Sequence, residues 1–483
     1  MRMSKVIVLF LAIFMVVALM GPTTLGAKKT MTIMLPWGVP GAGQPDPMGD
    51  AFKAWKIVYE AKHPEIEVKI LEMGWDDHWT WIRAHAAAGD LPDVLCQRVD
   101  NGHGFIVPTP EQESQGKSIF LALDDYLNLK NPYTRIPLVK DYTQANLGAA
   151  RYNLKHIYFL PISQGMSALI YNADAFKKAG IRTAPTTLTD FLAALKKLRA
   201  AGYKNPIGGP GIATDGNIVT LFAGWLAGSA FKTWAAQYCG TDPLQMNYKA
   251  FYQAVIDGKL SYKDSRVKKL WDACKEISTY YDPGSYSRDY NMVWDPFNKG
   301  DYVIMPEWSG RFIRAQQAIV GKTAAFKAVG GMNFPIMDKA ALEQSDAVRN
   351  GPLSTWGCTW SIAADAEKRG TLEAAKDFLW WWASGKENDI CWNQAKPDSA
   401  NGDAPPTITA LKKWKFKATV PFLFENMVDS YGGYVLWAND QLQRQIYQYV
   451  LAYYQGQIGY DELAANADQL NIAFCKTGLA QLK

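Results

Sequence analysis

The chain has 483 residues, a formal net charge of +5 and 13% aromatic residues, among them 18 tryptophans. This length exceeds what one ordinary hydrophobic core organises, so two or more domains are expected. The positive charge is too small and too evenly spread to indicate a nucleic-acid-binding protein.

The first 27 residues have the layout of a secretory signal peptide. Arg2 and Lys5 give a positive start, residues 6–20 form an unbroken apolar run, and small and polar residues follow as far as Ala27. Fifteen apolar residues are too few to span a bilayer comfortably, although a short N-terminal anchor is the alternative. No cysteine lies near the expected cleavage site after Ala27. We therefore expect a periplasmic or extracellular protein that is not a lipoprotein.

The next segments alternate between strand and helix patterns. Residues 30–37 (TMTIMLPW) predict a strand, and residues 50–63 predict a helix capped by Asp50. Residues 67–71 (EVKIL) predict a second strand, residues 79–89 a helix, and residues 94–99 (VLCQRV) a third strand. This rhythm indicates an α/β domain with a largely parallel sheet.

The rhythm continues to the C-terminus. A long extended run is expected at 157–172, with helices at 173–180 and 187–202. Residues 294–308 contain a helix end and a strand, and residues 358–365 form another strand. Two further helices are expected at 371–386 and 460–474. The adjacent tryptophans 380–382 project about 100° apart around one helix, so we expect them to pack between layers rather than form a binding platform.

The sequence lacks the motifs of the common enzyme classes. It has no GxSxG, HExxH, phosphate-loop or GxGxxG pattern, so no cofactor or metal is expected. His78 and His85 lie about 10 Å apart along one helix face, too far to share one ion. Asp76 and Asp77 are adjacent, whereas glycosidase carboxylates flank a bond from opposite sides. We interpret them as residues that start a helix.

The six cysteines never show CxxC spacing, which argues against a zinc ribbon. Export permits disulfides, but six cysteines allow fifteen complete pairings. Local pairing weakly favours Cys239 with Cys274 and Cys358 with Cys391.

Several segments together resemble the extracellular solute-binding proteins of bacterial ABC importers, in the carbohydrate-binding branch that includes maltose-binding protein. The segments HPEIEVKI and AAAGDLPDVL are similar to that family's N-terminal lobe, and residues 157–198 to its first crossing strand and second lobe. FNKGDYVIMPEW is similar to the segment that leads to a ligand-facing tryptophan, and AAKDFLWWWASGKE to the helix after the second crossing.

The resemblance implies an α/β fold of two lobes, each a mostly parallel sheet flanked by helices, joined by a hinge of several strands. Lobe 1 would comprise residues 28–161 and 355–402, and lobe 2 residues 162–354 and 403–483. The ligand would bind between the lobes, and closure around it would present a surface to a membrane permease. Because closure needs lobe motion, any disulfide is expected to lie within one lobe. A monomer is expected.

Ligands of open α/β sheets bind beyond the carboxyl ends of strands, which directs attention to the residues there. Trp37 and Trp75 follow the first two predicted strands, Asp76 comes next, and Asp100 follows the third. By the resemblance, Asp100 best matches a position that makes polar contacts in the family; its carboxylate could accept two sugar hydroxyls, or it could be an ordinary turn residue. Asp215 could cap a helix or bind a hydroxyl.

The remaining candidates rest on the resemblance. Trp308 matches the family's ligand-facing tryptophan and would stack on a sugar ring, with Glu307 and Arg311 as polar neighbours. Gln164 lies beside a hydroxyl-binding position of the family that is Gly165 here, a departure that leaves its role open. Trp356, Tyr434 and Trp437 resemble further aromatic contacts, with core packing as the alternative for each.

These observations predict a sugar or oligosaccharide receptor that performs no chemistry. One alternative is a secreted glycoside hydrolase, which also uses tryptophans and carboxylates. Another is the same receptor fold for a peptide, a polyamine or a phosphate ester.

Overall fold

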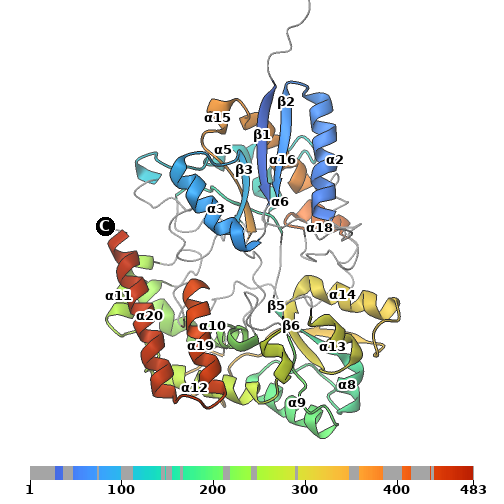
Figure 1. Cartoon of the computed structure of the whole chain (residues 1–483), viewed down its shortest axis with the longest axis vertical. Helices are drawn as coiled ribbons and strands as arrows, with labels where there is room; N and C mark the ends of the chain where they lie inside the picture. Colours follow the sequence, from blue (N-terminus) through green and yellow to red (C-terminus); the bar gives the residue numbers. More distant parts are fainter. Residues whose placement is uncertain are drawn as a thin grey trace, which may run out of the picture.

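The computed structural model forms two lobes, which Figure 1 shows one above the other. The predicted signal peptide lies outside the part of the chain that the structure describes. The described residues are 28–35, 47–72, 75–98, 113–142, 147, 155–163, 167–209, 218–240, 247–288, 292–347, 358–384, 405–414, 436 and 440–481.

Lobe 1 is built on a five-stranded sheet with the order β2-β1-β3-β8-β4. Its strands are β1 (Lys29–Leu35), β2 (Ile66–Glu72), β3 (Val94–Arg98), β4 (Leu160–Pro161) and β8 (Cys358–Ile362). β1 runs parallel to β2 and β3, whereas β8 runs antiparallel to both β3 and β4. All the strands except β8 therefore point the same way, which confirms the mostly parallel sheet.

Alternating side chains place the two faces of this sheet against different helices. Met31 and Ile33 pack with Phe52 of α2 (Pro47–Lys62), whereas Met34 packs with Ile82 of α3 (Trp75–Ala88). The period of two along a strand produces this division. The other helices of lobe 1 are α5 (Asp124–Asn128), α6 (Leu138–Asp141), α15 (Ala366–Arg369), α16 (Leu372–Ser384) and α18 (Ile408–Lys413).

Lobe 2 repeats the strand arrangement of lobe 1. Its regular sheet has the order β6-β5-β7, with β5 (Ser167–Asn172) antiparallel to both β6 (Ile304–Trp308) and β7 (Val329–Met332). Single parallel bridges extend this sheet from Ile304 to Ile207 and from Ile207 to Tyr281. The order from Tyr281 to β7 thus corresponds to β2-β1-β3-β8-β4, with β5 as the one reversed strand.

Helices cover both faces of the lobe 2 sheet. The helices of lobe 2 are α8 (Ala173–Lys178), α9 (Leu188–Ala200), α10 (Ile218–Cys239), α11 (Tyr248–Ile256), α12 (Ser265–Ser278), the 3-10 helix η2 (Pro283–Tyr286), α13 (Trp294–Lys299), α14 (Ser309–Val320), α19 (Asp440–Tyr454) and α20 (Tyr460–Gln481). On one face of the sheet, Leu169 and Ile304 pack in a cluster with α9, α10 and α12. On the other face, Ile170 and Met305 pack with Phe297 of α13 and Phe312 of α14.

The chain passes from β4 in the first sheet to β5 in the second within a few residues. The segment 405–414, which the sequence analysis assigned to lobe 2, contacts lobe 1 instead. Thr407 donates to the Ala383 carbonyl at 2.8 Å, and the Thr409 N–H donates to Asp141 at 2.8 Å. This short segment therefore belongs with lobe 1, and the other predicted lobe boundaries stay predictions.

Two helices begin earlier than the sequence analysis predicted. α2 starts at Pro47, so Asp50 lies in its first turn and does not cap it. α3 starts at Trp75 rather than at Trp79, so Asp76 and Asp77 also lie within a first turn. The aspartates are favourable in these positions as well, because negative charge in a first turn complements the helix dipole.

The tryptophans of α16 pack between layers, as expected. Trp381 and Trp382 are buried, and the indole N–H of Trp382 donates to the Ile162 carbonyl at 2.9 Å. This hydrogen bond ties α16 to the chain just before it leaves lobe 1. Trp55, Trp234 and Trp271 are also buried on their helices.

Replacing Trp382 with phenylalanine should destabilise lobe 1 more than replacing Trp380 does. Both changes shrink a ring, but only Trp382→Phe leaves the buried Ile162 carbonyl without its donor, a loss of about 1–3 kcal/mol. Urea unfolding followed by far-UV circular dichroism measures the difference, with Trp380→Phe as the control. Equal midpoints for the two variants would contradict the prediction.

The predicted Cys239–Cys274 disulfide is wrong. Cys274 is a buried free thiol on α12, hydrogen-bonded with Tyr454 of α19, and burial raises its pKa to about 12. Packing against α19, not the spacing to Cys239, decides its environment. The side chains of Cys358 and Cys391 lie outside the described residues.

Candidate functional site

The carboxyl ends of the lobe 1 strands lie at one edge of the sheet. β1, β2 and β3 end at Leu35, Glu72 and Arg98, and in Figure 1 these ends and the first turn of α3 lie on the side of lobe 1 that faces lobe 2. Trp75 and Asp76 are the first two residues of α3, so their backbone stands at this edge. Their side chains lie outside the described residues.

A second edge is formed by β5 and β6 in lobe 2. Trp308 ends β6 and is paired with Ser167, the first residue of β5 after the crossing from lobe 1. Glu307 precedes it on the strand, and Arg311 is the third residue of α14. The structure thus brings the backbone of three predicted site residues together at the carboxyl end of β6, without describing their side chains.

Arg98 of β3 is paired with Cys358 of β8. In the sequence, Asp100 follows Arg98 by two residues and Trp356 precedes Cys358 by two. Trp356 and Asp100 themselves lie outside the described residues. So do Trp37, Gln164, Asp215, Tyr434 and Trp437.

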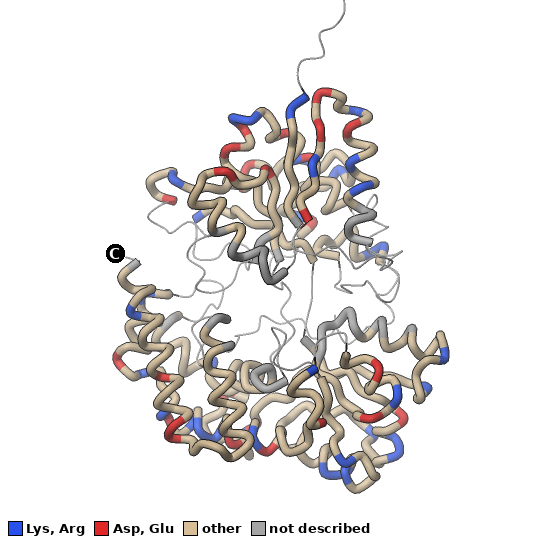
Figure 2. Tube along the Cα trace, viewed as in Figure 1, with Lys and Arg blue, Asp and Glu red and all other residues tan. Residues whose placement is uncertain are grey.

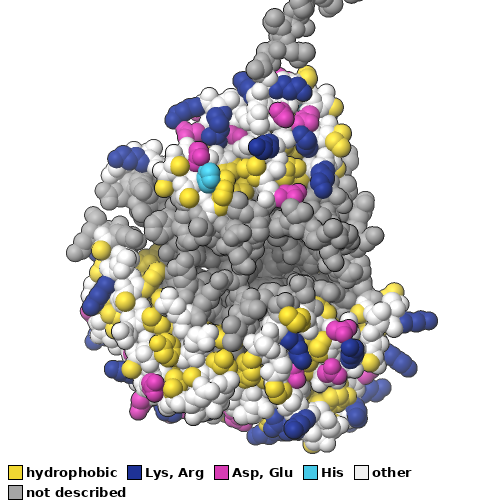
Figure 3. Space-filling model, in the orientation of Figure 1, with side chains coloured by type: hydrophobic (Ala, Val, Ile, Leu, Met, Phe, Trp, Pro, Cys, Tyr) yellow, Lys and Arg dark blue, Asp and Glu magenta, His cyan; other side chains and the backbone are white. Residues whose placement is uncertain are grey.

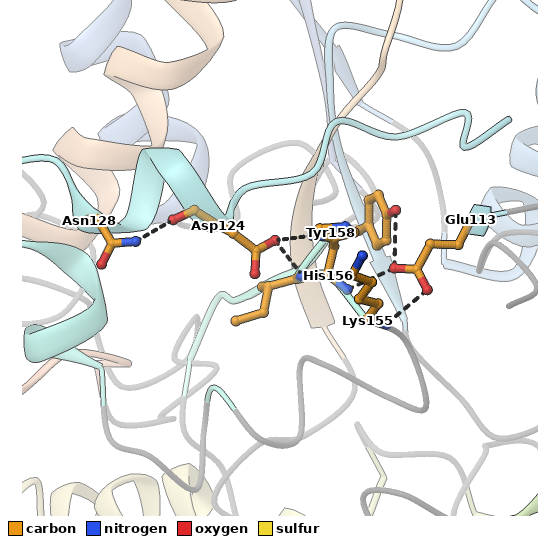
Figure 4. A network of polar contacts seen from close by, with 7 residues as sticks. Glu113, Asp124, Asn128, Lys155, His156 and Tyr158 are labelled. Atoms are coloured by element: carbon orange, nitrogen blue, oxygen red, sulfur yellow. Dashed lines mark hydrogen bonds and ion pairs between the residues drawn. The ribbon is translucent and has the colours of Figure 1, made fainter. Parts of the chain in front are cut away.

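A polar network holds the strand that leads into the first crossing (Figure 4). The Glu113 carboxylate accepts the N–H groups of Lys155 and His156 at 2.8 and 2.7 Å, and the Tyr158 hydroxyl at 3.3 Å. Asp124 accepts the Ile157 N–H at 3.0 Å and lies 3.2 Å from His156 Nδ1. Burial, together with the Glu113 charge, raises the pKa of Tyr158 to about 12. The network fixes the chain on the lobe 1 side of the crossing.

Charges of both signs are interspersed over the outer surfaces of the two lobes (Figures 2 and 3). The described residues hold no cluster of three or more His, Cys, Asp or Glu side chains that could bind a metal ion. Among the helices that the structure describes, none combines the length and apolar character needed to cross a bilayer.

The sequence analysis missed one segment at the lobe 2 edge. Residues 282–288 follow Tyr281, which occupies the position in the second sheet that β2 occupies in the first. They therefore correspond in place to Trp75 and Asp76. The only signal in the sequence is the Asp-Pro-Gly turn directly after two tyrosines, and it carries no family motif.

Two mixed sheets of matching strand order, with the strand ends at one edge of each, define the class of two-lobed α/β binding proteins. The family of bacterial extracellular solute-binding proteins matches residues 54–421 of the chain. The chain belongs to this family, as the sequence resemblance predicted. This membership favours a solute-binding protein over a glycoside hydrolase.

Individual relatives agree with this assignment. The chain is 23% identical over 265 residues to a probable sugar-binding periplasmic protein of Mesorhizobium japonicum. The aligned region covers 52% of this chain and 53% of that protein. The chain thus spans about half the length of this curated relative.

Solved structures share the fold over almost the whole chain. A chitin oligosaccharide binding protein has a TM-score of 0.66 at 17% identity, covering 93% of this chain and 100% of that one. A solute-binding protein from Agrobacterium vitis, solved with D-mannitol, has a TM-score of 0.57 at 16% identity, covering 93% and 98%. At these identities the likeness concerns the fold.

Proposed function

We propose that the protein is the extracytoplasmic receptor of an ABC importer and binds a sugar or oligosaccharide between its lobes. The observation that carries the proposal is the matching order of the two sheets, because ligands of such sheets bind beyond the carboxyl ends of the strands. The sugar-binding relative and the sugar-binding proteins of like fold support the substrate class.

In this proposal, Trp37, Trp75 and Trp308 stack on sugar rings, with Trp356, Tyr434 and Trp437 as further aromatic contacts. Polar contacts to hydroxyls come from Asp76, Asp100, Gln164, Asp215, Glu307 and Arg311. The backbone positions of Trp308 and Trp75 support these roles, because each lies where a strand gives way to a helix. An indole offers a large rigid apolar face, which suits the C–H face of a sugar ring.

Binding is proposed to favour a closed arrangement of the lobes, which a membrane permease would recognise. A ligand can shift this equilibrium only if it binds the closed state more tightly. Only a few residues separate the end of β4 at Pro161 from the start of β5 at Ser167, which supports a hinge at the first crossing. The protein is proposed to act as a monomer after export.

A thermal-shift screen of the chain without residues 1–27 tests the substrate class. Neutral mono- and oligosaccharides should raise the melting temperature, because a ligand at 100 times its Kd stabilises the folded state by about 2.7 kcal/mol. Peptides, polyamines and phosphate esters form the other arms of the screen. Stabilisation by one of these and by no sugar would contradict the proposal, and a sugar-induced fall in the radius of gyration would support closure.

A further inference from the structure

Residues 282–288 form a loop at the carboxyl edge of the lobe 2 sheet, and hydrogen bonds hold this loop to the neighbouring segment. The Asp282 N–H donates to the Ile207 carbonyl at 2.6 Å, and η2 follows at once. Ser285 is fully buried, and its hydroxyl accepts the Gly209 N–H at 3.1 Å. This bond ties the loop to the segment after the neighbouring strand, so two loops at one edge are held together.

The loop carries an ion pair between Asp282 and Arg288. The Arg288 Nη1 donates to the Asp282 carboxylate, and each side chain is 22% exposed. The guanidinium also lies 5.9 Å from the ring of the buried Tyr302. Within the part of the chain that the structure describes, Arg288 donates to Asp282, and a guanidinium carries five N–H donors in all.

Gly284 lets the guanidinium of Arg288 approach the loop closely. A Cβ at this position would stand 2.6 Å from Arg288 Nη2, closer than a carbon can approach. The φ of Gly284 is not in the left-handed region, so its missing side chain serves the close approach and not the backbone conformation. The hydrogen bond to Asp282 and the close approach to Gly284 therefore hold the guanidinium of Arg288 in place before a ligand binds.

We infer that Arg288, held by Asp282, is a ligand-binding residue on lobe 2 and selects neutral sugars over sugar acids. A fixed guanidinium presents several coplanar N–H donors, which suit neighbouring hydroxyl oxygens. The Asp282 carboxylate cancels its charge and repels a second carboxylate, so the pair disfavours a uronic acid. This inference rests on the proposed sugar-binding function.

Isothermal titration calorimetry on the chain without residues 1–27 tests the inference. The probes are the neutral sugar that stabilises the wild type and the uronic acid of the same ring. Arg288→Ala should weaken binding of the neutral sugar at least about tenfold, the range for hydrogen bonds from a charged group. Gly284→Ala should also weaken it, because the guanidinium must move. Asp282→Asn should shift the affinity ratio at least about tenfold towards the uronic acid at low salt.

The matched control is the Asp264–Arg266 pair, whose side chains are 25% and 26% exposed. Arg266 stacks on Trp234 at 3.9 Å, near the C-terminal end of α10 and about 24 Å along that helix from its first residue. Arg266→Ala should leave sugar affinity unchanged. Thermal melts verify that every variant is folded.

The possible failures are distinguishable. A wild type that binds no sugar overturns the proposed function and this inference with it. If the wild type binds a sugar, and Arg288→Ala and Gly284→Ala bind it with affinities within twofold of the wild type, only this inference is overturned. An unchanged ratio in Asp282→Asn overturns the selection against sugar acids.

Discussion

Replacing Trp308 with alanine should weaken sugar binding by roughly 30-fold or more, the effect of losing a central aromatic contact worth at least about 2 kcal/mol. Trp308 ends β6 opposite the first residue of β5 and immediately precedes α14. This junction lies at the edge where ligands of such sheets bind. Calorimetric titration with the sugar identified by the thermal screen measures the loss.

Trp271→Ala provides the control for that experiment. Trp271 is completely buried on α12, so its removal should reduce stability by about 3–5 kcal/mol without changing the affinity of the folded protein. If Trp308→Ala bound the sugar within threefold of the wild type, its stacking role would be wrong. A loss of affinity in both variants would indicate a general structural effect.

Replacing Asp93 with asparagine should destabilise lobe 1 by about 1.5–3 kcal/mol, the range for hydrogen bonds to a charged group, because Asp93 is buried while its partner Arg369 is 34% exposed. Asp93 is 1% exposed and lies 2.7 Å from Arg369 Nε. Its carboxylate also accepts the Thr32 N–H at 2.7 Å and the Thr371 hydroxyl at 2.6 Å. One carboxylate thus joins β1, the start of β3 and the turn before α16.

Urea unfolding measures this effect, with Asp365→Asn as its control. Asp365 pairs with Lys368 at 2.7 Å, but the two side chains are 44% and 83% exposed, so the loss should stay below about 1 kcal/mol. Equal unfolding midpoints for Asp93→Asn and Asp365→Asn would show that the buried network adds no stability.

Periodicity and turn chemistry in the sequence predicted most of the elements. The apolar strands β1, β2 and β3, the amphipathic α9 and the helix with three adjacent tryptophans were all recognisable, because local patterns dictate such elements. Helix starts were less predictable. Pro47 and Trp75 open their helices before the aspartates that resemble caps, since a first turn accepts the same residues as a cap position.

Family membership and the two-lobed α/β fold could be determined from the sequence alone, because they depend on the order and spacing of many local segments. The tertiary structure decided what depends on contacts between distant segments. It placed residues 405–414 on lobe 1, left Cys274 as a thiol, and set Asp282 beside Ile207 with Arg288 paired to Asp282. No local pattern encodes these neighbours, because sheet order brings together residues that lie far apart in the chain.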